Sequence, residues 1–171
     1  MRSDRYSRIL VGTVAMALVA CMDDPTEPVG TTFVTLTGQF NAARVTPVPT
    51  GGANSTATGS ATCTIAAATF TCTVSATGLT AAPTLMHVHA GAVGASGAVR
   101  VNICSNVAIV GVPTCPTAAT FSNFSSGAQP ATGATYAEVA AAMLNYGTYV
   151  NIHTAAYTAG EIRGQLVKAP E

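Results

Sequence analysis

The three histidines of this sequence are spaced in a way that could create a metal site. His87 and His89 stand two residues apart within 85–90, and His153 follows within 149–154. Because side chains alternate along a β-strand, His87 and His89 point to one face, with their Cα atoms about 6–7 Å apart. Imidazoles at this spacing can converge on one ion, and His153 would add a third imidazole. Imidazole ligands suit zinc, copper, iron or nickel. The spacing therefore predicts a three-histidine metal site, with copper or zinc as the ion.

The same strands also predict a polar network that needs no ligand. Asn151 shares a strand face with His153, Glu161 shares one with Arg163, and Arg100 projects from the polar face of its own strand. Hydrogen bonds across the strands, and an ion pair from Glu161 to Arg163 or Arg100, would fix the register of the sheet. The sequence leaves both interpretations open, a metal or ligand site and a structural network.

Short β-strands must position these side chains. Stretches rich in Gly, Pro, Ser and Thr separate the strand-like segments, which is typical of an antiparallel sandwich or barrel. One segment predicts a helix over 136–145, because Thr135-x-x-Glu138 is a capping box and Gly147 can end the helix. We therefore expect an all-β antiparallel sandwich or barrel-like domain with one short α-helix. The predicted strands are 33–38, 59–65, 70–76, 85–90, 98–104, 148–154 and 161–167.

Four cysteines could form two disulfides in this domain. Cys63 and Cys72 flank a predicted hairpin with its turn at 67–68, which would place them directly opposite each other. Cys104 and Cys115 would then close the loop between them. No C-x-x-C pair is present, so a cysteine-based zinc site is not expected. Each disulfide would stabilise the fold by about 2–4 kcal/mol.

The first residues carry the features of an export signal. Three arginines precede an apolar run over 9–20, which is shorter than the roughly 20 residues that a membrane span needs. The run ends in LVAC at residues 18–21, which resembles the bacterial lipobox, where the cysteine is lipidated and becomes the mature N-terminus. We therefore expect Cys21 to carry a lipid anchor.

This signal divides the chain into three parts. We expect a lipoprotein signal peptide over 1–20, an acidic and proline-containing tether over 21–30, and the β domain over 31–168. The protein would be exported to the cell envelope and held at the membrane by lipid. Met22 follows the cysteine where inner-membrane lipoproteins usually carry Asp, so the resemblance favours the outer membrane in a Gram-negative source.

The charge composition argues against several function classes. Only 8% of the residues are charged and the formal net charge is zero, so we expect no nucleic-acid partner. The sequence contains no phosphate-binding P-loop, no dinucleotide fingerprint and no nucleophile elbow. No spacing suggests an activated serine, and we assign no catalytic residue.

Several blocks of the sequence resemble the CHRD (chordin) domain family. They are FVTLTG at 33–38, LMHVHAG at 85–91, GTYVNIHT at 147–154 and GEIRGQL at 160–166. The resemblance covers about residues 31–167 and implies a β-sandwich-like fold that occurs in chordin and in many exported microbial proteins. For the microbial members, the resemblance does not imply an established chemical activity. We therefore expect a lipid-anchored, non-catalytic binding or structural module with an unidentified protein or surface partner. The alternative is a small copper- or zinc-binding protein that stores the metal or carries out redox chemistry.

Overall fold

The computed structural model describes residues 34–46, 55–66, 69–130, 133–145 and 147–170. The chain divides into two units, and the first, Met1–Gly30, lies outside the described residues. The expected signal peptide, tether and Cys21 anchor fall there. In the second unit the elements are β1 (Val34–Asn41), η1 (Ala42–Arg44), β2 (Thr58–Ala66), β3 (Thr69–Thr77), β4 (Pro83–Ala90), β5 (Val99–Ser105), β6 (Phe121–Pro130), α1 (Tyr136–Leu144), β7 (Thr148–Thr154), β8 (Ile162–Gln165) and β9 (Val167–Lys168).

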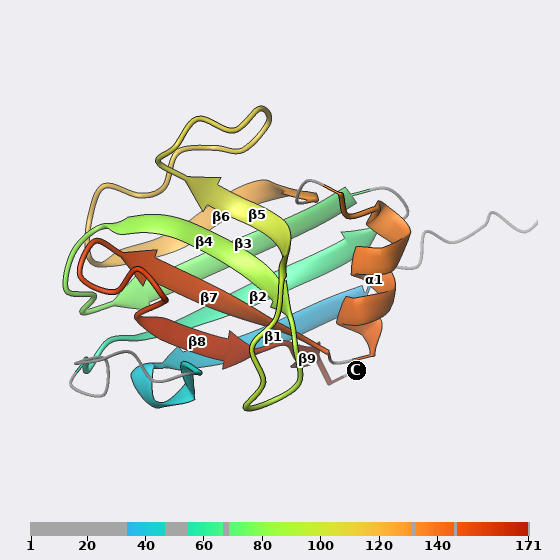
Figure 1. Cartoon of the computed structure of the whole chain (residues 1–171), viewed down its shortest axis with the longest axis horizontal. Coiled ribbons are helices and arrows are strands. Elements are labelled where there is room, and N and C mark those ends of the chain that lie inside the picture. Colours follow the sequence, from blue (N-terminus) through green and yellow to red (C-terminus); the bar gives the residue numbers. More distant parts are fainter. Residues whose placement is uncertain (1–33, 47–54, 67–68, 131–132, 146, 171) are drawn as a thin grey trace, which may run out of the picture. The chain divides into compact units, whose positions relative to one another are not determined.

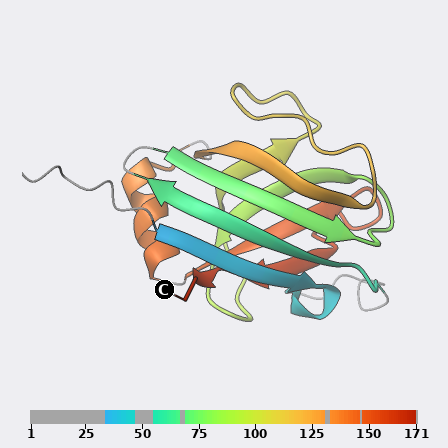
Figure 2. The ribbon, with the colours of Figure 1, turned by 180° about the vertical axis from the view of Figure 1, so that it is seen from behind.

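The strands form an antiparallel sheet that curls back on itself. Their order is β2-β3-β6-β5-β4-β7-β8-β1-β9, and β1 also pairs with β2 along its whole length. Strands β4, β5, β7 and β8 lie in front in Figure 1. The view from behind in Figure 2 shows β1, β2, β3 and β6 as the other layer. The domain is thus a flattened barrel, and the predicted all-β fold is confirmed.

The alternation of side chains fills the barrel as the sequence predicts. Met86 and Val88 of β4 and Val150 and Ile152 of β7 are fully buried in the core. The residues between them point to the outer face of the same strands. That outer face of β4 and β7 carries the three histidines.

Both predicted disulfides are present. Cys63 lies directly opposite Cys72 in the register of β2 and β3, with a Cα–Cα distance of 4.1 Å. Cys104 and Cys115 are joined with a Cα–Cα distance of 4.9 Å and close the loop after β5. All four cysteines are buried in the core, so the bridges are part of its packing. The turn predicted at 67–68 lies outside the described residues.

The predicted helix is α1, which covers one end of the barrel in Figure 1. Thr135 and Glu138 form both hydrogen bonds of the capping box. Val139 and Met143 are buried against the core, and Tyr136 stacks on Phe70 with ring centroids 4.3 Å apart. No helix among the described residues is long and apolar enough to cross a membrane.

Two features of the sheet differ from the prediction. Strand β6 was not expected, because its sequence FSNFSSGAQP is rich in Ser and Gly and lacks a regular apolar alternation. It pairs with β3, and the buried Ser126 hydroxyl donates a hydrogen bond to the Ile103 carbonyl of β5. The single strand expected over 161–167 is divided into β8 and β9 on either side of Leu166.

A glycine allows the barrel to close between β8 and β1. A side chain at Gly164 would overlap the Phe40 ring and the backbone of Gln39. Beside this contact, Arg163 of β8 pairs with Asn41 of β1. The Phe40 ring thus packs on bare backbone at the seam of the barrel.

Candidate metal centre

The three histidines converge on the outer face of β4 and β7. In the register of these strands Leu85 lies opposite His153, and His87 lies opposite Asn151. One ring nitrogen from each histidine lies within 4.8 Å of the corresponding nitrogens of the other two. The centroid of the His87 ring is 5.3 Å from that of His153 and 5.6 Å from that of His89. The structure therefore brings together the three residues that the strand spacing predicts.

Each histidine presents one buried nitrogen without a hydrogen-bond partner. These atoms are Nδ1 of His87 and Nε2 of His89 and His153. The Nδ1 atom of His89 lies 2.9 Å from the Gly97 carbonyl oxygen, and that of His153 lies 2.9 Å from the Thr158 carbonyl oxygen. A carbonyl can only accept, so each Nδ1 carries the hydrogen and Nε2 of the neutral ring keeps its lone pair. Metal-binding histidines are typically oriented in this way.

The cluster is somewhat wider than a filled site. Three nitrogens bound to one ion at about 2.0–2.1 Å lie about 3.3–3.6 Å from one another. The ring nitrogens here lie within 4.8 Å of each other. Small rotations of the imidazoles would therefore bring the three lone pairs onto a common centre.

Burial keeps the three imidazoles neutral. His87 is 9% exposed and His153 is 7% exposed. Burial lowers the pKa of His87 from 6.5 to about 4, with smaller contributions from the charges of His153 and His89. Burial also lowers the pKa values of His89 and His153, although hydrogen bonds to backbone carbonyls oppose this. At neutral pH each ring is therefore uncharged, with one N–H and one nitrogen lone pair.

Two loops cover the outer face of β7 around the histidines. The first spans residues 91–98 and the second spans residues 155–161. In the first loop, the Gly97 carbonyl accepts a hydrogen bond from His89. The Gly97 amide donates a second hydrogen bond to the Tyr149 hydroxyl at 3.3 Å. The second loop accepts from the Asn151 side-chain amide at its Ala159 carbonyl, 3.1 Å away. The two loops thus position the histidines through backbone groups.

Two members of the predicted polar network border this cluster. Asn151 of β7 lies opposite Arg163 of β8. The Arg163 guanidinium lies over the Tyr149 ring, and that ring stacks on His89 with centroids 5.0 Å apart and planes inclined by 7°. Tyr149 therefore holds one flank of the His89 imidazole.

The other two members lie elsewhere. Arg100 is near enough to Glu138 of α1 to lower the pKa of that carboxyl, although hydrogen bonds from Thr135 lower it more. Glu161 is fully buried at a different part of the barrel. The expected ion pair from Glu161 to Arg163 or Arg100 is not among the contacts of the described residues.

Hydroxyl groups replace that ion pair around Glu161. One carboxylate oxygen accepts hydrogen bonds from the Ser55 hydroxyl at 2.8 Å and the Thr80 amide at 2.9 Å. The other accepts from the hydroxyls of Thr80 and Thr154, each at 2.8 Å. Glu161 therefore ties together three segments of the domain, and neither of its oxygens is available to a metal at the histidines.

Tyr149 belongs to the site, although the sequence analysis assigns it no role. Its ring contacts both His89 and Arg163. A signal was present, because Tyr149 shares the strand face of Asn151 and His153. The carbonyls of Gly97 and Thr158 had no such signal, since any residue supplies a carbonyl.

Comparison with protein-family models supports the resemblance seen in the sequence. The model of the CHRD domain matches residues 25–166, a range that contains the three histidines and both disulfides. Searches of curated proteins and of solved structures found no match. The family match covers well over half of the 171 residues. The chain therefore belongs to the CHRD-domain family.

Proposed function

We propose that this CHRD domain is a binding module whose ligand is a transition-metal ion, copper or zinc, held by His87, His89 and His153. One observation carries the proposal: each of the three histidines has a ring nitrogen within 4.8 Å of those of the other two, and each has one buried ring nitrogen without a hydrogen-bond partner. Buried polar atoms are normally paired, and each unpaired one costs about 1–3 kcal/mol. A shared ion would satisfy all three at once.

A purely structural network explains these contacts less well. Such a network would give each ring partners at both nitrogens, whereas His89 and His153 have a partner at Nδ1 and none at Nε2. His87 Nδ1 has none either. Protonation does not relieve this arrangement, because burial lowers the pKa of all three groups. His89 and His153 therefore each keep a lone pair at Nε2 that no hydrogen bond uses.

The donor set favours a borderline metal. It offers three neutral nitrogens and no thiolate, because Cys63, Cys72, Cys104 and Cys115 are in disulfides. Imidazoles suit zinc and copper, and three of them leave a coordination position open to water or another small ligand. Redox activity would follow only if the ion is copper.

Metal loading tests this proposal. The protein is purified without a histidine tag, incubated separately with copper and zinc, desalted, and measured for metal by mass spectrometry. We expect about one tightly bound ion per chain, lost in His87→Gln and His153→Gln, while circular dichroism shows an intact β fold. Ser96→Ala, an exposed change in the loop over 91–98, is the matched control and should keep the ion. Absence of bound metal after both incubations would overturn the proposal.

We also propose that the protein is exported and held at the cell envelope by a lipid on Cys21, at the outer membrane in a Gram-negative source. The apolar run ending at Cys21 supports this proposal, and two disulfides suit an oxidising compartment. Metabolic labelling with a fatty acid should mark the wild-type chain and leave Cys21→Ser unlabelled and released from membranes. A labelled or membrane-bound Cys21→Ser chain would contradict the anchor.

A further inference from the structure

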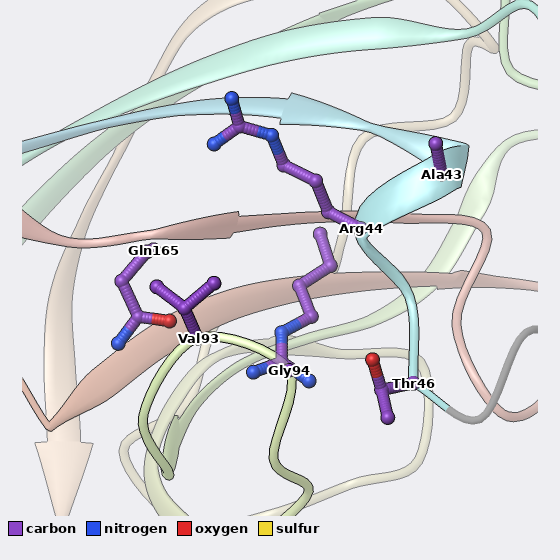
Figure 3. Close-up of a pocket in the computed structure, with 7 residues that line it drawn as sticks. Ala43, Arg44, Thr46, Val93, Gly94 and Gln165 are labelled. Atoms are coloured by element: carbon purple, nitrogen blue, oxygen red, sulfur yellow. The ribbon is translucent and has the colours of Figure 1, made fainter.

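A pocket of about 340 Å³ lies beside the histidine site, between η1, β8 and the loop over 91–98. Figure 3 shows the labelled residues of its wall, with Arg44 on one side and Gly94 and Val93 on the other. None of the three histidines lines this pocket. Its polar and charged lining residues are Arg44, Thr46, Arg163 and Gln165.

A buried positive charge lines the pocket without a counter-charge among the residues that the structure describes. Arg163 is only 2% exposed. Its Nη2 donates to the carbonyls of Ala92 and Ala95 at 3.1 and 2.7 Å, and its plane covers the Tyr149 ring. Its Nη1 is buried and has no hydrogen-bond partner. Burying a guanidinium in this way is costly unless its remaining donors and its charge are matched.

A second arginine lines the same pocket. Arg44 is the last residue of η1 and is exposed, so its side chain can move toward a ligand. Thr46 adds a hydroxyl as a neutral donor, whereas the Gln165 side-chain amide already donates to the Gly91 carbonyl at 2.9 Å. No Asp or Glu is among the described lining residues, so the local charge is positive. Guanidinium groups present forked donors that match the oxygens of carboxylates and phosphates.

We infer that this pocket binds a small oxyanion, a carboxylate or a phosphate group, through the guanidinium of Arg44 and the adjacent positive charge of Arg163. The carbonyl bonds and the Tyr149 stack explain how Arg163 is held, but they leave Nη1 unused. They also give no reason for a second cation in the same lining. An anion in the pocket would supply the missing counter-charge.

Calorimetric titration of the metal-free protein with acetate and, separately, with inorganic phosphate tests this inference. We expect saturable binding of at least one of the two anions, and the tighter one identifies the ligand class. Arg44→Gln should weaken that binding about tenfold or more, because an exposed guanidinium is lost without disturbing the core. Arg163→Lys keeps the charge but loses the fork, and should weaken binding as well.

A third arginine provides the matched control. Arg100 lies near α1 and does not line the pocket, so Arg100→Gln should bind the anion as the wild type does. An equal loss in Arg100→Gln, unchanged binding in Arg44→Gln, or no binding of either anion would overturn the inference. Arg44 contacts none of the histidines, so metal measured in Arg44→Gln tests the metal site separately.

Discussion

The Arg163 guanidinium carbon lies 3.3 Å from the centre of the Tyr149 ring. Tyr149 comes from the strand between β4 and β8, and its ring also stacks on His89. One aromatic ring therefore separates the arginine of the anion pocket from a histidine of the candidate metal centre. Burial is the main cause of the lowered pKa of His89, and the positive charge of Arg163 lowers this pKa further.

The Tyr149 ring should matter for metal affinity as a positioning group. We expect Tyr149→Leu to weaken metal binding about tenfold or more, because the ring that orients the His89 imidazole is lost. Tyr149→Phe keeps the stack and loses only the acceptor for the Gly97 amide, so its affinity should fall less. Competition with a chelator of known affinity measures both variants. Wild-type affinity in Tyr149→Leu would show that the ring does not position His89.

The metal-free protein should lose stability as the pH falls from 7 toward 4. His87 binds protons with a pKa near 6.5 when unfolded and about 4 when folded, so protons favour the unfolded chain between these values. The contribution of neutral His87 to the free energy of unfolding is fully present above pH 6.5. A loss on the order of 3 kcal/mol is expected when the pH reaches 4. Urea unfolding at pH 7 and 4.5 measures this change.

Removing His87 supplies the control for this pH dependence. His87→Gln lacks the titrating group, so its free energy of unfolding should fall less over the same interval. Bound metal should oppose the loss until protons displace the ion. Equal slopes in the wild type and in His87→Gln would assign the acid sensitivity to other groups.

Glu161 should stabilise the fold without affecting the metal. Glu161→Ala removes the acceptor of four hydrogen bonds and leaves the hydroxyls of Thr80 and Thr154 with only their mutual contact at 3.4 Å. We expect a loss of about 3 kcal/mol in the free energy of unfolding, measured by urea denaturation. Glu161→Gln keeps one acceptor oxygen and should lose less. Loss of metal from a folded Glu161→Gln protein would contradict the separation of the two sites.

Gly164 should be intolerant of any side chain. An added methyl group would overlap the Phe40 ring and the Gln39 backbone, so Gly164→Ala should force β8 away from β1. We expect a destabilisation of about 3 kcal/mol by thermal or urea unfolding. Gly127 is the matched control, because a Cβ there meets nothing within 4 Å. Similar stabilities for Gly164→Ala and Gly127→Ala would show that the seam can relax.

The alternation of apolar and polar residues was enough to predict the core and the histidine face. Met86 and Val88 point inward and His87 and His89 outward because a strand has a period of two. The Cys63–Cys72 pair was also predictable, since a hairpin places its cysteines opposite each other.

Contacts that depend on loops were not predictable in the same way. The partners of Glu161 include Ser55 and Thr80, which precede strands and carry no periodic signal. Arg44 and Arg163 line the same pocket because η1, which directly follows β1, lies next to β8. Strand β6 was missed because its pairing with β3, rather than its own composition, makes it a strand.

Two of the three histidines are oriented by backbone carbonyls, and this affects how sequences of this fold can diverge. His89 and His153 are each oriented by a carbonyl, and a carbonyl survives nearly every substitution of the residue that carries it. Thr158 is exposed, so that position can vary freely while the His153 tautomer is kept. Gly97 cannot, because a side chain there would overlap the Ala90 carbonyl. Related chains can therefore differ at exposed positions such as Thr158 and still hold the same imidazole lone pair in place.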